Sequence, residues 1–95
     1  DLLPPLTAYY VMRVGRLPLV PYFAPGDPEL AQAVGLKAKD AHAVLLANHG
    51  PVVSGKTLRE AQYACEELEE TAKLYLMLKG RDIRPLTDKQ RAALG

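Results

Sequence analysis

The segment "HGPVVSGKT" (residues 49–57) follows a short apolar run and precedes the strongest helical pattern of the chain, so its conformation decides the arrangement of the fold. Read from Gly50, it matches G-x-x-x-x-G-K-T, the pattern of a phosphate-binding P-loop. Read from His49, it places a histidine at the end of a strand, which is a common way to present a metal ligand. The two interpretations predict different chemistry.

The residues inside the segment argue against a P-loop. A P-loop binds phosphate by pointing successive backbone N–H groups at the phosphate oxygens. Pro51 has no N–H to donate, and Val52 and Val53 favour an extended backbone. The chain after Thr57 has an almost entirely helical pattern, which leaves no second strand for the aspartate that helps to hold Mg²⁺. We therefore expect a strand here, with Lys56 as a solvated turn residue and no nucleotide bound.

Strand patterns occur in four short segments. Residues 42–48 form an apolar run typical of a buried strand, and residues 51–55 form a second, short β-branched run. Residues 9–14, "YYVMRV", are rich in aromatic and β-branched side chains and are also predicted to form a strand. Residues 17–23 are the fourth segment that is predicted to be extended. Their two prolines place this segment at a sheet edge or in a loop that lines a cleft.

Capping residues predict where the helices begin. Asp27 followed by Pro28 starts a helix that runs to about residue 39, and the T-x-x-Q pattern at residues 87–90 starts a short last helix. Thr57 and Glu60 form a T-x-x-E capping box that opens the longest helix.

The longest helix is expected to bury one face and to end near Gly80. The apolar stripe that predicts this face consists of Leu58, Ala61, Cys65, Leu68, Ala72 and Tyr75. Cys65 is therefore expected to be a core residue and not a nucleophile. Leu74 and Leu76 point away from the stripe, and this surplus apolar surface suggests contact with another chain or another segment.

The composition excludes several classes of partner. The chain has 95 residues, 48% of them apolar, and a formal net charge of +1 from 12 basic and 11 acidic side chains, without a basic block that would suggest nucleic acid. No apolar run approaches the roughly 18 residues of a membrane span. Cys65 is the only cysteine, which fits a reducing, cytoplasmic compartment. The apolar start "DLLPPLTAYY" without an initiator Met suggests a trimmed terminus or a fragment of a longer chain.

His49 has two interpretations on spacing alone, a histidine hydrogen-bonded within a turn or a metal ligand. Zinc usually takes three or four protein ligands. His42, the only other histidine, lies seven residues away at the far end of the same predicted strand and on the opposite side of its pleat. The two histidines are therefore not expected to share an ion.

The sequence as a whole resembles the class II aldolase/adducin family. "AVLLANHGPVVSGKTLREAQYACEELEETAKLYL" (43–76) is similar to the C-terminal segment of that family, where a strand ends in a His-Gly pair and a long Glu-rich helix follows. "LPLVPYFAPGDPELA" (17–31) is similar to its preceding P-Y-x-x-x-G-x-x-x-L segment. "PPLTAYYVMRVGRLPLVPYFAPGDPEL" (4–30) most resembles the branch that decarboxylates 3-oxo-tetronate 4-phosphates.

The resemblance implies an α/β fold in which helices pack on a largely antiparallel sheet. Residues 1–95 would form the C-terminal part of one such domain, whose upstream half is absent from this sequence. The complete protein would be a metal-dependent lyase of carbohydrate metabolism that decarboxylates a sugar-acid phosphate through a metal-stabilised enediolate. The alternatives are a sugar-phosphate aldolase of the fuculose or rhamnulose 1-phosphate type and a non-catalytic, adducin-like scaffold.

The resemblance also assigns site residues. The family binds a divalent metal, usually zinc, through three histidines, and the third of these maps to His49. The first two histidines, a glutamate and the phosphate-binding loop lie upstream and do not occur here. A tyrosine that protonates the carbon maps to Tyr9, with Tyr10 one residue off, although packing would also explain either side chain. Tyr22 is expected to be a structural residue of the P-Y turn. The family forms fourfold-symmetric homotetramers with active sites between neighbouring subunits.

Overall fold

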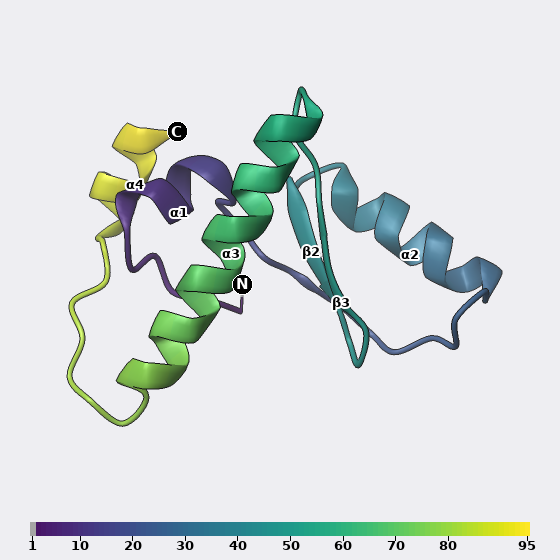
Figure 1. Cartoon of the computed structure of the whole chain (residues 1–95), viewed down its shortest axis with the longest axis horizontal. Helices are drawn as coiled ribbons and strands as arrows, with labels where there is room; N and C mark the ends of the chain where they lie inside the picture. The colour runs from purple at the N-terminus through teal and green to yellow at the C-terminus, as the bar shows by residue number, and fades with distance from the viewer. Residues whose placement is uncertain (1) are drawn as a thin grey trace.

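The computed structural model describes residues 2–95, which form a small three-stranded sheet and four helices (Figure 1). The elements in chain order are α1 (Ala8–Arg13), β1 (Leu19–Val20), α2 (Pro28–Ala38), β2 (Ala43–Leu46), β3 (Gly50–Val53), α3 (Leu58–Leu78) and α4 (Asp88–Leu94). None of the helices in residues 2–95 is both long enough and apolar enough to cross a membrane.

The sheet has the strand order β1-β2-β3 and is mixed. β2 and β3 form an antiparallel hairpin, whereas β1 runs parallel to β2 with Leu19 opposite Leu45. Pro18 and Pro21 flank β1, which is an edge strand, as the prolines predicted. The expected α/β fold is confirmed, and the segment that spelled a P-loop is paired strand at residues 50–53.

The prediction of a strand at residues 9–14 is wrong, because this segment is helix α1. Thr7 caps the helix, with its Oγ1 accepting a hydrogen bond from the Tyr10 N–H at 3.2 Å. Tyr10 and Val14, four residues apart on one helical face, are both buried. The aromatic and β-branched residues therefore reflect burial of one face of a helix, not a pleated strand.

Helix α3 begins where the sequence predicted, but its buried face is rotated. Thr57 Oγ1 accepts from the Glu60 N–H at 3.1 Å, while the Glu60 carboxylate reaches back to the Lys56 N–H at 2.9 Å instead of to Thr57. The fully buried residues are Ala64, Leu68 and Thr71, and Cys65 is half-buried beside them. The prediction that Leu58 lies in the core is wrong. Its side chain is 87% exposed in the first turn of α3.

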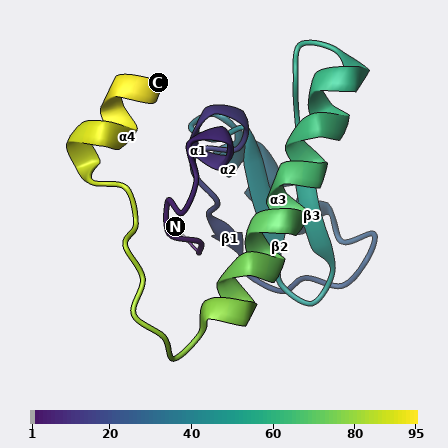
Figure 2. The same ribbon diagram turned by 60° about the vertical axis from the view of Figure 1, so that its left-hand side comes forward.

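The remaining helices follow their predicted caps. Asp27 accepts from the Glu29 N–H at 2.9 Å at the start of α2, and α4 has a reciprocal capping box between Thr87 and Gln90. Gly80, with φ of 81°, follows the end of α3. Figure 2 shows the long extended segment that then leads from α3 to α4.

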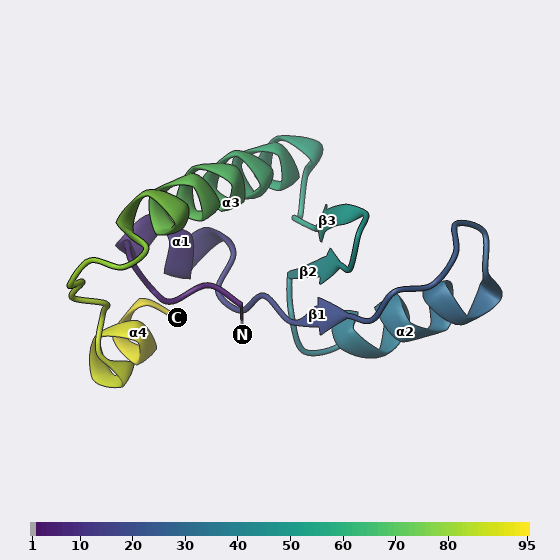
Figure 3. The same cartoon turned by 90° about the horizontal axis from the view of Figure 1, so that it is seen from below.

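The core lies where α1, α3 and the sheet meet. Its buried members are Leu3, Tyr10, Val14, Leu17, Ala43 and Leu68. Figure 3 shows the sheet between α3, which lies next to β3, and α2, which lies next to β1. α1 packs mainly against α3 and α4 and meets the sheet in the core, whereas the β2–β3 turn lies in a different part of the molecule, at the lower end of the hairpin (Figure 1).

Candidate functional site

The β2–β3 turn presents His49 at its end. The His49 N–H donates to the Leu46 carbonyl at 3.0 Å and closes the turn. Asn48 has φ of 63°, in the left-handed region that asparagine tolerates better than most side chains. This conformation reverses the chain within three residues and leaves the His49 side chain on the surface.

The His49 imidazole is oriented by the loop that follows β1. Its Nε2 lies 3.1 Å from the Phe23 carbonyl oxygen. A carbonyl oxygen can only accept, so Nε2 carries the hydrogen and Nδ1 keeps its lone pair. The Tyr22 ring packs nearby, with ring centroids 6.0 Å apart and planes tilted by 34°. Two contacts from one loop therefore orient the ring with Nε2 toward the Phe23 carbonyl.

This arrangement suits one ligand of a metal site. Metal-binding histidines characteristically donate their second ring N–H to a carbonyl or carboxylate, which leaves the other nitrogen for the metal. Within the part of the chain that the structure describes, no group of three or more histidine, cysteine, aspartate or glutamate side chains could hold an ion. His42 precedes β2 whereas His49 follows it, so the two histidines stand at opposite ends of the strand, as expected. The chain thus fits a metal centre as the source of a single imidazole ligand.

The two tyrosines considered as proton donors have opposite environments. Tyr9 is 61% exposed on α1, whereas Tyr10 is 1% exposed in the core. Burial raises the pKa of the Tyr10 phenol above its ordinary value of 10.0, and the positive charge of Arg91 acts in the opposite direction. The Tyr10 hydroxyl has no hydrogen-bond partner among residues 2–95. Of the pair, only Tyr9 has a phenol accessible to a substrate.

The structure does not bring Tyr9 and His49 together. In Figure 1, α1 lies on the left beside α3 and α4, while the β2–β3 turn lies at the lower end of the hairpin. Tyr9 instead packs beside Arg13, whose guanidinium carbon lies 5.6 Å from the centre of the Tyr9 ring.

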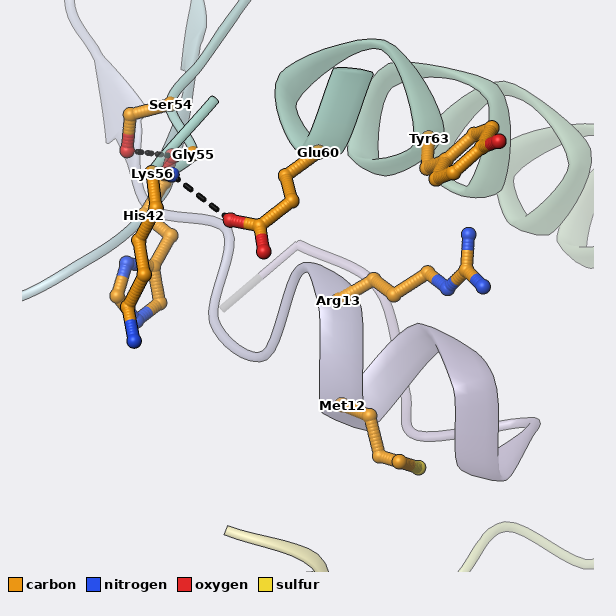
Figure 4. Close-up of a pocket in the computed structure, with 8 residues that line it drawn as sticks. All are labelled: Met12, Arg13, His42, Ser54, Gly55, Lys56, Glu60 and Tyr63. Carbon is orange, nitrogen blue, oxygen red and sulfur yellow. Dashed lines mark hydrogen bonds between the residues drawn. The ribbon is translucent and has the colours of Figure 1, made fainter. Parts of the chain in front are cut away.

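A pocket of about 680 Å³ opens on the α1 side of the molecule (Figure 4). Its lining comes from α1, the residue before β2, the β3–α3 turn and the start of α3, namely Met12, Arg13, His42, Ser54, Gly55, Lys56, Glu60 and Tyr63. Sequence reasoning missed this pocket because it assigned Met12 and Arg13 to a strand. The Thr7 cap would have indicated a helix there instead.

Comparison with known proteins relates this chain to class II aldolases and to a decarboxylase. The family model of the class II aldolase and adducin N-terminal domain matches residues 1–76. The 3-oxo-tetronate 4-phosphate decarboxylase of Escherichia coli K12 is 56% identical over 90 residues, which are 95% of this chain and 42% of that protein. The L-fuculose phosphate aldolase of Haemophilus influenzae is 36% identical over 77 residues, 80% of this chain and 36% of that protein.

Solved structures agree with these relatives. The crystal structure of YgbL from Escherichia coli superposes with a TM-score of 0.93 at 53% identity, over 99% of this chain and 45% of that one. YgbL from Klebsiella pneumoniae gives a TM-score of 0.95 at 52% identity, over 100% of this chain and 46% of that one. The chain therefore spans less than half the length of the relatives that it matches.

Proposed function

Because this chain belongs to the class II aldolase/adducin family, we propose that it is part of a metal-dependent carbon–carbon lyase acting on a small sugar-acid phosphate. The reaction that we favour is decarboxylation of a 3-oxo-tetronate 4-phosphate. Relatives named for that reaction are 51–56% identical, whereas the fuculose phosphate aldolase is 36% identical. In this proposal residues 1–95 are the C-terminal part of one domain in a cytoplasmic protein.

The observation that carries the proposal is the orientation of His49. With Nε2–H donated to Phe23, the Nδ1 lone pair is available to a divalent ion, and zinc is our proposed metal. When bound, such an ion would act as a Lewis acid that stabilises the negative charge left on the substrate when neutral carbon dioxide departs. The role of this chain is then to hold one imidazole rigidly, through the Phe23 carbonyl and the Tyr22 ring.

We further propose that Tyr9 protonates the carbon that loses carbon dioxide. Its phenol is exposed, and α1 does not approach the β2–β3 turn of the same chain. Tyr9 would therefore serve the site of a neighbouring copy in a homotetramer, which makes the sites composite. Tyr10 is unsuited to this role because its hydroxyl is enclosed in the core.

A parallel assay of two substrates on the full-length protein tests the proposed reaction. We expect release of carbon dioxide from 3-oxo-tetronate 4-phosphate, little cleavage of L-fuculose 1-phosphate, and a fall in kcat/KM of roughly 100-fold or more in His49→Ala, because metal stabilisation is worth several kcal/mol. Preferential cleavage of the ketose phosphate would identify an aldolase instead. Absence of turnover with either substrate would favour the adducin-like scaffold.

A further inference from the structure

We propose that the pocket between α1 and the start of α3 binds a small phosphorylated organic anion through Arg13 and Lys56. The pocket lies at the His42 end of β2, the opposite end of that strand from the His49 of the same chain. Its volume of about 680 Å³ falls within the range of roughly 300–1,000 Å³ typical of small-molecule sites.

The charge of the lining favours an anion. Arg13 and Lys56 are both cationic, and Glu60 is the only carboxylate among the described residues that line the pocket. Neither cation forms an ion pair with any residue from 2 to 95. Figure 4 shows Lys56 and His42 on one side of the opening, Arg13 beneath Tyr63 on the other, and Glu60 between them. A phosphate group entering this space would meet positive charge on two sides.

Aromatic rings hold Arg13 in place. Its guanidinium carbon lies 5.0 Å from the centre of the Tyr63 ring on α3 and 5.6 Å from that of the Tyr9 ring on α1. A guanidinium that packs on rings keeps its N–H groups at the planar edge available for a bidentate contact with an anion. Since both partners belong to the packed α1–α3 pair, little entropy would be lost when Arg13 binds a ligand.

The β3–α3 turn fixes the position of Lys56. A side chain at Gly55 would place its Cβ 2.6 Å from the Ala61 nitrogen, so only glycine permits this close approach of the turn to α3. The Lys56 N–H is already bonded to the Glu60 carboxylate at 2.9 Å, and the Glu60 N–H is capped by Thr57. The Lys56 ammonium, rather than these backbone donors of the helix start, is therefore the group available to an anion.

The lining also indicates the kind of anion. Arginine and lysine together form a typical phosphate-binding pair, one planar and bidentate and the other a point charge. Met12 and Tyr63 add apolar surface that inorganic phosphate would not use. The pocket is therefore suited to a phosphate monoester with a short carbon chain.

Calorimetric titration of the full-length protein with glycerol 3-phosphate tests the assignment, with glycerate as the carboxylate probe. Arg13→Gln and Lys56→Gln should each weaken glycerol 3-phosphate binding by roughly tenfold, since each removes a charge-assisted hydrogen bond. Glu60→Gln keeps a hydrogen-bond acceptor but removes the opposing charge, so it should tighten binding severalfold. Lys73→Gln, at an exposed position of α3 outside the pocket, is the matched control and should change nothing.

The directions of these effects separate this site from any other phosphate site on the protein. Opposite changes in Lys56→Gln and Glu60→Gln are not expected from a loss of folding. Wild-type affinity in the double variant Arg13→Gln/Lys56→Gln would overturn the proposal, even if glycerol 3-phosphate still bound elsewhere. Binding of glycerate without glycerol 3-phosphate would overturn the phosphate assignment.

Discussion

His49 and Phe23, 26 residues apart in the sequence, are joined by a hydrogen bond of 3.1 Å between the imidazole Nε2 and the main-chain carbonyl oxygen. This contact links the loop after β1 to the β2–β3 turn, and it determines which ring nitrogen is free. Because the acceptor is a backbone atom, the orientation of the ring depends on the path of two chain segments and not on a replaceable side chain.

The first prediction concerns Asn48, whose positive φ shapes the turn that carries His49. Asn48→Val should lower the free energy of unfolding by about 1–2 kcal/mol, because a β-branched residue is strained in the left-handed region. It should also weaken metal binding by displacing His49. Asn48→Gly is the matched control and should preserve both properties. Urea denaturation and zinc titration of the full-length variants provide the measurements, and equal stability of the valine and glycine variants would show that the turn is not constrained.

The second prediction concerns the close approach at Gly55. Gly55→Ala should destabilise the protein by about 1–3 kcal/mol, because its Cβ would lie 2.6 Å from the Ala61 nitrogen and 2.9 Å from the Glu60 Cβ. Gly35→Ala on α2 makes the same change where no atom lies within 4 Å, and it should stabilise by about 0.5–1 kcal/mol through helix propensity. Thermal unfolding compares the pair; similar effects of the two substitutions would disprove the tight turn.

The third prediction follows from the buried phenol of Tyr10. Because burial raises its pKa above 10.0, the native state retains this proton at a pH where the unfolded chain loses it. The stability that comes from keeping the Tyr10 phenol protonated is therefore fully present below about pH 10, and it is lost as the pH rises above that value. Tyr10→Phe should therefore lose less stability than wild type between pH 8 and pH 11, and at pH 8 it should be equally stable or up to about 1 kcal/mol more stable. Parallel losses in the two proteins would show that Tyr10 does not titrate differently on folding.

The fourth prediction concerns assembly and the role of Tyr9. Leu76 and Met77 are largely exposed near the end of α3, which is surplus apolar surface of the kind that associates with another chain. We expect the full-length protein to be a homotetramer by light scattering, and Tyr9→Phe to lower kcat without altering stability. A fully active monomer at nanomolar concentration would contradict both the tetramer and the shared role of Tyr9.

The caps show why much of the fold was predictable from sequence. Asp27, Thr57 and Thr87 act on backbone N–H groups two or three residues away, so their signal is local and was interpreted correctly. Thr7 is a cap of the same kind, yet the composition of residues 9–14 outweighed it and gave the wrong element. The exposed Leu58 was misassigned because spacing along a helix does not reveal where its tertiary partner ends.

The candidate site was only partly predictable for a related reason. His49 stands beside Gly50 at a strand end, which the sequence shows directly. Its contact with Phe23 and the packing of Arg13 on Tyr63 join segments 26 and 50 residues apart, and they depend on how the elements pack. No local pattern encodes those distances, so the pocket emerged only from the structure.

Metal content of the full-length protein tests the central assignment most directly. Wild type, His49→Ala and His42→Ala should be dialysed side by side and titrated with zinc, and their metal should be measured by mass spectrometry. We predict that His42→Ala retains wild-type zinc, while His49→Ala loses more than about 100-fold in affinity, because outer-shell partners alone account for about 10–100-fold. Wild-type stoichiometry and affinity in His49→Ala would show that this histidine is not a metal ligand.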